Sequence, residues 1–165
     1  MAEPVSDLRL RAAVLADVPD ILRLLSEDAI GPSREERYGD ASAPTYHQAF
    51  AAIEADPNNE LVVATVGDRV VGCMQLTRIR YLNFQGGTRL QVEGVRVDRE
   101  MRSLGIGEAM LRYAIEQATL NGCHLVQLTT NAQRTDAHRF YRRLGFTATH
   151  VGFKLHLPEV EPDQE

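Results

Sequence analysis

Two glycines lie where the sequence changes from a strand pattern to a helix pattern. A run of alternating apolar residues ends at Val97, and apolar residues recur at helical spacing from Ile106 onward. Glycine disfavours a helix by about 0.8–1 kcal/mol relative to alanine, so a pair in the first turn indicates that a ligand approaches the backbone closely. The segment between strand and helix consists of Arg102, Ser103, Leu104, Gly105, Ile106 and Gly107.

This segment has the properties of an anion site. The first turn of a helix has N–H groups without intrahelical partners and carries the positive end of the helix dipole. Because Gly105 and Gly107 lack a Cβ, a phosphate oxygen can reach those groups. A P-loop would need a lysine where Glu108 stands, and a dinucleotide motif would need a third glycine or alanine where Met110 stands. The segment predicts a site for a phosphate or pyrophosphate, with a tight turn that binds nothing as the open alternative.

The elements that position this segment follow from hydrophobic periodicity. A strand ending at Val97, a helix from Ile106 to the stop signal Asn121-Gly122, and the strand after it form a βαβ unit with two parallel strands. The earlier strands are expected to form an antiparallel meander. The expected strands are 8–12, 61–66, 70–80, 90–97, 123–130 and one or two within 146–157, and the expected helices begin near 17, 45, 106 and 135.

Composition limits the class of protein. The chain has 165 residues and a formal net charge of −5, which fits one globular domain and disfavours nucleic acid or a membrane as partner. We expect this domain at 8–157, between a flexible tail at 1–7 and a disordered acidic tail at 158–165. The first residues show no secretory signal, and no apolar run approaches the ~18 residues of a membrane span. We therefore expect a cytoplasmic protein.

The glycine segment resembles a known signature. Arg102-x-x-Gly105-x-Gly107 is similar to the motif that opens a helix in the GNAT superfamily of N-acetyltransferases, and the run Phe-Tyr-Arg-Arg-Leu-Gly-Phe at 140–146 is similar to a second motif of that superfamily. The order of elements from residue 8 to about 157 also matches. The resemblance implies a GNAT fold of the α/β (α+β) type. Its mixed, mostly antiparallel sheet would have six or seven strands with a central splayed parallel pair, flanked by about four helices.

The resemblance also implies an acyl donor. Acetyl-CoA would be the co-substrate, with its pyrophosphate on the backbone of 102–107. The strand before this segment would splay from its parallel neighbour, so that the main chain of Val95 and Val97 pairs with the amides of the pantetheine arm. The side chains of these valines are expected to be core. An N–H near Val95 would polarise the thioester carbonyl.

Two residues are candidates for proton transfer. The resemblance places a general acid at Tyr141, whose phenol, with a pKa of about 10, is close enough in acidity to a thiol to protonate the leaving thiolate. Tyr141 also lies on an apolar helical stripe with Phe140, so a core position is the alternative. Glu93 lies two residues before Val95 and is the candidate base. A structural carboxylate, with only water as base, is the alternative for Glu93.

One position departs from the superfamily pattern. Many members have a coenzyme-binding asparagine seven residues before the tyrosine, where this sequence has Arg134. Asn131 lies three residues earlier and is our candidate for that contact. Arg134 could instead meet the 3′-phosphate of the coenzyme or cap the loop.

These inferences lead to a predicted function. We expect an N-acetyltransferase that moves an acetyl group from acetyl-CoA to a primary amine by direct transfer in a ternary complex. A non-catalytic GNAT-like module that binds acyl-CoA, as a sensor or partner domain, is the alternative. The acceptor would be a small-molecule or peptide amine, a homodimer is possible, and the histidines show no metal-ligand spacing, so no metal is expected. Acidic residues within 26–46 are compatible with a cationic amine.

Overall fold

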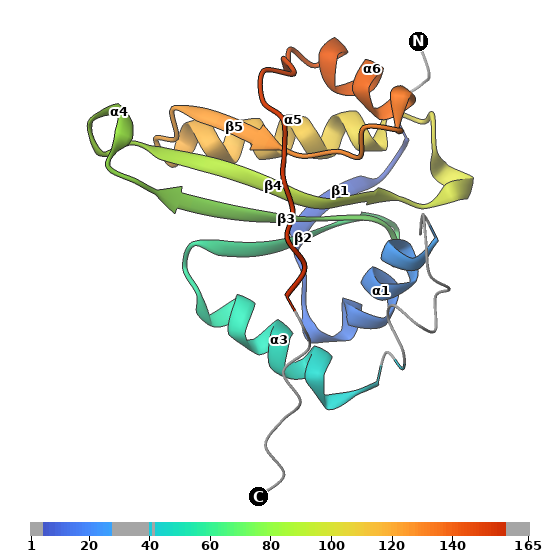
Figure 1. Cartoon of the computed structure of the whole chain (residues 1–165). Coiled ribbons are helices and arrows are strands. Elements are labelled where there is room, and N and C mark those ends of the chain that lie inside the picture. Colours follow the sequence, from blue (N-terminus) through green and yellow to red (C-terminus); the bar gives the residue numbers. More distant parts are fainter. Residues whose placement is uncertain (1–4, 28–39, 41, 158–165) are drawn as a thin grey trace, which may run out of the picture. The chain divides into compact units, whose positions relative to one another are not determined.

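The computed structural model describes residues 5–27, 40 and 42–157 (Figure 1). Contacts divide the chain into two compact units, Met1–Leu128 and Thr129–Glu165. The first unit contains the sheet and the two ends of the βαβ connection. Most of the predicted tails lie outside the described residues, and the single domain at 8–157 stays a prediction.

The first unit is built on a mixed sheet. Its strands are arranged in chain order, and successive strands are antiparallel except for the last pair, β4 and β5, which is parallel. The predicted meander and βαβ unit are therefore confirmed. The strands are β1 (Leu8–Ala12), β2 (Asn59–Val66), β3 (Arg69–Arg80), β4 (Thr88–Val97) and β5 (Leu125–Leu128).

The predicted strand count and the place of the parallel pair are wrong for the described part of the chain. The sheet there has five strands rather than six or seven, and β5 is its last strand, so the parallel pair lies at the edge and not at the centre. The strand predicted at 123–130 is also shorter, at Leu125–Leu128. A strand extends only as far as it has a partner for its ladder of hydrogen bonds, and side-chain alternation does not report that partner.

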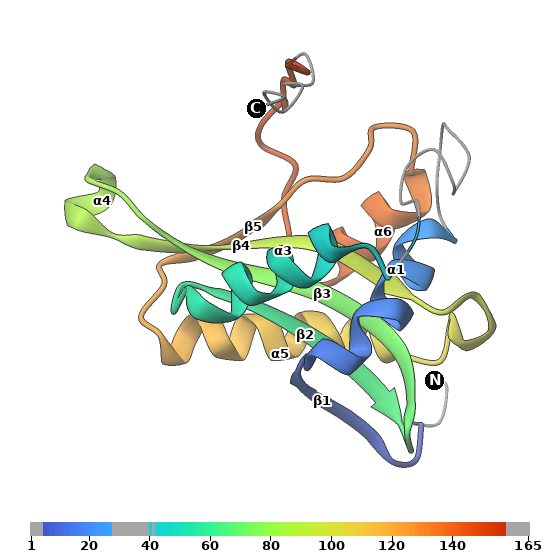
Figure 2. The same ribbon diagram turned by 90° about the horizontal axis from the view of Figure 1, so that it is seen from below.

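Helices cover both faces of this sheet. The helices α1 (Val18–Ser26) and α3 (Pro44–Ala55) lie on one side, and α5 (Ile106–Leu120) lies on the other (Figures 1 and 2). A short helical turn, α4 (Asn83–Gly86), closes the long hairpin of β3 and β4. Two 3-10 turns, η1 (Leu15–Asp17) and η2 (Arg99–Met101), precede α1 and α5.

Close packing fixes α5 on the sheet. Gly72 of β3 lies under this helix, and a Cβ built on it would be 2.8 Å from the sulfur of Met110 and 3.1 Å from the carbonyl oxygen of Arg96. A larger residue at 72 would push the helix away, so the helix approaches the sheet because this position has no side chain. The inward residues of α5 are fully or almost fully buried: Ile106, Met110, Leu111 and Ala114.

The second unit contains α6 (Thr135–Arg143), which ends at Gly145 with a φ of +92° as the helix stop signal predicts. The strands predicted within 146–157 are wrong, because this segment has no assigned strand. Its alternating apolar side chains are 79–94% exposed instead of paired in a sheet. These side chains are Val151, Phe153, Leu155 and Leu157.

The packing of α5 can be tested in solution. Met110→Ala should lower the free energy of unfolding by about 2–5 kcal/mol, because it leaves a cavity between the helix and Gly72. Leu120→Ala, at a residue 73% exposed at the end of the same helix, should change it by less than ~0.5 kcal/mol. Urea denaturation followed by circular dichroism measures both. Equal losses would contradict the packing described.

Candidate active site

A β-bulge interrupts β4 near its carboxyl end. The register with β3 runs residue for residue to the pair Gln75 and Glu93, and then shifts so that Cys73 faces Arg96. Gly94, inside the shift, has a φ of +61°, which favours glycine. Bulges bend a strand and increase its twist. The bulge therefore turns β4 at the position where the sequence predicts the reacting groups.

The parallel pair separates at the same place. The ladder between β4 and β5 joins Arg89–Val92 to Leu125–Leu128 and includes no further pair in the described residues. The following residues of β4, Glu93–Val97, pair on the side of β3. On the opposite side their backbone can accept an extended ligand with the hydrogen bonds of a strand. This is the splay that the sequence resemblance implies for Val95 and Val97, whose side chains are half-buried.

Glu93 is exposed and lies beside a row of hydrogen-bonding side chains. The cross-strand pairs Thr77 with Gln91, and Gln75 with Glu93, place these residues in adjacent rows of one sheet face. Gln127 of β5 donates to the side-chain oxygen of Gln91 at 2.6 Å. The carboxylate of Glu93 thus has neutral amides and a hydroxyl as its neighbours in the register.

The row continues to β2. The side-chain oxygen of Asn59 accepts from Thr77 at 2.7 Å and from Gln75 at 3.1 Å. Sequence reasoning recognised only Gln91 in this row. Alternating polar residues in three further strands were a signal for the others, but their alignment depends on the register of the sheet.

After β4 the chain forms the predicted strand-to-helix segment. Ser103 has a φ of +65° and Gly105 a φ of +83°, so two left-handed residues bring the chain to the start of α5. For Ser103 this conformation costs about 1–2 kcal/mol and must be held by its surroundings. The side chain of Arg102 donates to the carbonyl of Val97 at 3.2 Å, which joins the segment to the end of β4.

Gly105 is the N-cap of α5, and its side makes no capping hydrogen bond. The first hydrogen bond of the helix runs from the Ala109 N–H to the Gly105 carbonyl at 3.0 Å, so the N–H groups of 106–108 have no carbonyl one turn before them. A Cβ built on Gly105 would meet nothing within 4 Å. The space over the helix N-terminus is therefore open to a ligand, and these residues fit the pyrophosphate of a coenzyme.

Glu108 lies in this first turn, and an acidic side chain would repel an anion there. Its carboxylate accepts two hydrogen bonds from Arg112, at 2.7 and 3.0 Å. This i,i+4 pair offsets the negative charge of Glu108. The anion site is thus compatible with the acidic residue that follows its second glycine.

Two predicted site residues belong to the second unit. The ring of Tyr141 on α6 is half-buried and contacts Phe140 and Phe146, with ring centroids 5.3 and 6.0 Å away. The side-chain oxygen of Asn131 accepts from the Gln133 N–H at 2.9 Å and holds the turn before α6. The first unit brings together Glu93, Val95, Val97 and residues 102–107, whereas Asn131 and Tyr141 stay predictions for the same site.

The cysteines do not offer a nucleophile. Cys73 is buried, and burial raises the pKa of its thiol to about 12. Burial also raises the pKa of the Cys123 thiol. Since the thiolate is the reactive form, neither side chain suits covalent catalysis. Among the described residues, no group of three histidine, cysteine or acidic side chains is placed to hold a metal ion. None of the described helices has the length and apolar character needed to span a membrane.

Comparison with known proteins agrees with this geometry. The chain matches the acetyltransferase (GNAT) family over residues 19–146. An aminoalkylphosphonate N-acetyltransferase of Salmonella typhimurium is 34% identical over 111 residues, which are 66% of this chain and 70% of that protein. A transcriptional regulator from Bacillus halodurans C-125 is 42% identical, with a TM-score of 0.85 over 91% of this chain and 99% of that one. A Trypanosoma brucei acetyltransferase shares the fold, with 24% identity and a TM-score of 0.74 over 92% and 100% of the two chains.

The fold and these relatives define the class as acyl-CoA-dependent N-acetyltransferases. The chain belongs to the acetyltransferase (GNAT) family, as its glycine segment and its Phe-Tyr run indicate.

The anion site can be tested at its N-cap. Gly105→Ala should weaken acetyl-CoA binding about tenfold, because the added methyl group strains the left-handed N-cap and projects into the open space over the helix. Gly67→Ala is the matched control, since Gly67 also has a positive φ and an open surrounding but lies in the turn between β2 and β3. Titration calorimetry should show unchanged binding for Gly67→Ala. Equal weakening in the two variants would contradict the site.

Proposed function

We propose that this protein transfers an acetyl group from acetyl-CoA to a primary amine, directly and in a ternary complex. The observation that carries this proposal is the continuity between the open side of β4 and the glycine turn. The pairing with β5 stops at Val92, and the strand leads from there into the helix N-terminus at Gly105. An extended, amide-bearing arm that ends in a pyrophosphate matches this sequence of backbone groups.

The residues of β4 would act on the thioester. The Val95 N–H is assigned to the thioester carbonyl oxygen, where it stabilises the negative charge that develops during attack. The amine nitrogen forms a bond to the carbonyl carbon, and Glu93, directly or through a water, accepts the proton that the nitrogen loses. Glu93 is exposed and so has access to that proton.

Tyr141 would complete the reaction. As the carbon–sulfur bond breaks, its phenol donates a proton to the departing thiolate, and coenzyme A leaves as the thiol. The phenolate recovers a proton from solvent. This assignment rests on the Phe-Tyr run at 140–146, and no acyl-enzyme is needed because the cysteine thiols are held in the protonated form by burial.

The acceptor is a small-molecule or peptide amine. A relative that is 34% identical is named for an aminoalkylphosphonate, which is a small amine. The row of amides beside Glu93 offers donors and acceptors of hydrogen bonds to a polar acceptor. Most of the acidic region proposed to select the acceptor lies outside the described residues.

A second candidate function is an acyl-CoA-binding module without catalysis, which would serve in regulation. The observation in its favour is that the 42% identical structure is named a transcriptional regulator. Release of free thiol from acetyl-CoA, measured with a panel of primary amines and followed by mass spectrometry of the product, separates the two. Thiol release with an acetylated amine supports the transferase. Tight binding of acetyl-CoA without release from any amine supports the module.

The acid role predicts a specific loss. Tyr141→Phe should lower kcat about 100-fold, because general acid catalysis contributes on the order of 10²–10⁴-fold, and should leave acetyl-CoA binding within a factor of two. Tyr113→Phe is the control, since Tyr113 is half-buried and its hydroxyl also bonds to a side chain, that of Glu60 at 3.4 Å. Steady-state thiol release and calorimetry measure the two quantities. Unchanged turnover of Tyr141→Phe would remove this residue from the mechanism.

The base role predicts a change in pH dependence. Glu93→Gln should abolish the acidic limb of the profile of kcat/KM against pH, because the amide cannot accept the proton at any pH. Glu116→Gln, at an exposed position of α5, should retain the limb. If both variants keep the wild-type profile, Glu93 is a structural carboxylate and water alone accepts the proton.

A further inference from the structure

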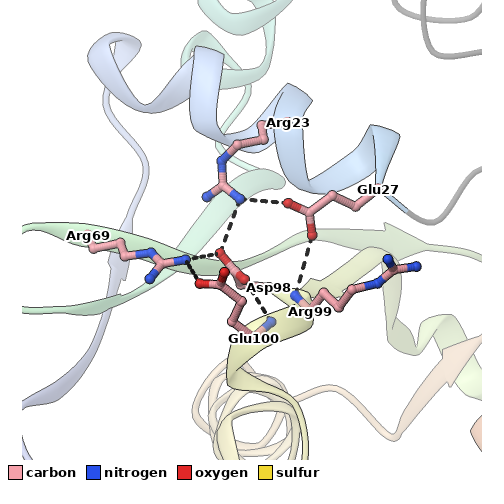
Figure 3. A pocket seen from close by; sticks show the side chains of 6 residues that line it. All are labelled: Arg23, Glu27, Arg69, Asp98, Arg99 and Glu100. Carbon is pink, nitrogen blue, oxygen red and sulfur yellow. Dashed lines mark hydrogen bonds and ion pairs between the residues drawn. The ribbon is translucent and has the colours of Figure 1, made fainter.

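A buried carboxylate lies at the beginning of the segment that leads to α5. The side chain of Asp98 is only 3% exposed and lies between two arginines, with Arg69 at 2.8 Å and Arg23 at 3.1 Å (Figure 3). Arg69 comes from the start of β3 and Arg23 from α1. Three separate elements of the first unit therefore meet at this residue.

Asp98 is held through its backbone as well as its side chain. Its N–H donates to the Val71 carbonyl of β3 at 2.8 Å, and its carbonyl accepts from the Met101 N–H at 2.9 Å. Its carboxylate accepts from the Glu100 N–H at 3.0 Å and so caps η2. The direction in which the chain leaves β4 depends on these contacts.

Two further contacts join the same arginines to the segment. Arg69 also binds the carboxylate of Glu100 at 3.0 Å. Arg23 donates to Glu27 at 2.7 Å, and Glu27 accepts from the Arg99 N–H at 3.4 Å (Figure 3). The last turn of α1 and the start of β3 thus hold successive residues of η2.

The electrostatics show that the carboxylate is ionised in this position. Burial raises the pKa of the Asp98 carboxyl, but the Glu100 N–H and the two guanidinium groups outweigh it and hold the pKa below its usual value. A buried charge of this kind is stabilised only while its partners are present, so the loss of one partner disturbs all the contacts around it.

The segment beyond Asp98 needs such an anchor. Ser103 and Gly105 are both left-handed, and Ser103 keeps this conformation only if the surrounding structure holds it. At the far end, Ile106 is 1% exposed and fixes the start of α5 in the core. At the near end, Asp98 and its arginines supply the corresponding fixed point.

We propose that Asp98 is a positioning residue for the acyl-CoA donor, held by Arg23 and Arg69, and that it acts through the conformation of residues 99–105 without touching the donor. This inference rests on the proposed function, since it concerns affinity for the same donor. Its consequence is that removing the carboxylate weakens donor binding more than it slows the transfer step, because β4 and its reacting groups precede the anchor in the chain.

The molecule contains a matched pair for comparison. Asp17 is also buried, with a side chain 8% exposed, and it binds Arg11 through two hydrogen bonds of 2.6 and 2.9 Å. It also accepts a backbone hydrogen bond, from Val14 at 2.8 Å. The Arg11 guanidinium holds the pKa of the Asp17 carboxyl below its usual value. This pair joins β1 to the start of α1 and makes no contact with residues 98–107 in these hydrogen bonds.

The experiment compares Asp98→Asn with Asp17→Asn in the full chain. Asp98→Asn should raise both the Kd of acetyl-CoA, measured by calorimetry, and its KM about tenfold, with kcat within about twofold of wild type. Asp17→Asn should lower the melting temperature as Asp98→Asn does but leave Kd and KM unchanged. Unchanged donor affinity in Asp98→Asn, or an equal rise in both variants, would overturn the inference.

Two further arms keep the result interpretable. If Asp98→Asn does not fold, Arg69→Ala and Arg11→Ala replace the pair, because these side chains are 53% and 43% exposed and their loss is milder. A higher Kd in Arg69→Ala alone supports the inference, and equal values overturn it. Wild-type protein that does not bind acetyl-CoA overturns the proposed function, whereas wild-type binding with an unaffected Asp98→Asn variant overturns the positioning role alone.

Discussion

The separation of β4 from β5 after four residue pairs is the constraint on which the rest of the site depends. A parallel strand in a sheet normally satisfies the backbone groups on both of its sides. Here the bulge at Gly94 bends β4, and Glu93–Val97 pair with β3 on one side only. A backbone edge of this kind can bind a ligand that imitates a strand, which is the feature that links this fold to an amide-bearing acyl carrier.

An open strand is useful only if the segment after it has a defined conformation. The left-handed Ser103 and Gly105 direct the free N–H groups of α5 along the same line. The packing of Met110 on Gly72 holds the helix against the sheet, and Asp98 with its two arginines holds the start of the segment. The site thus combines a mobile-ligand surface made of backbone with anchors made of buried side chains on either side of it.

Much of the fold was predictable from local pattern. The antiparallel meander, the βαβ unit and the helix over 135–143 followed from periodicity and from glycine stop signals, because these report local geometry. The strands predicted within 146–157 failed, since alternation at Val151 and Phe153 describes the side chains and not the presence of a neighbouring strand. For the same reason, the sequence could not show that the parallel pair lies at the sheet edge.

The sequence by itself determined the glycine turn, because Gly105 needs a positive φ that depends only on its own lack of a Cβ. It also determined the candidate donor and the residues proposed for proton transfer, through motifs of adjacent residues. The tertiary structure alone decided the bulge, the amide row beside Glu93 and the cluster at Asp98. Arg23 and Asp98 are 75 positions apart in the chain, and no local pattern specifies a contact between residues that only the folded sheet and helix bring together.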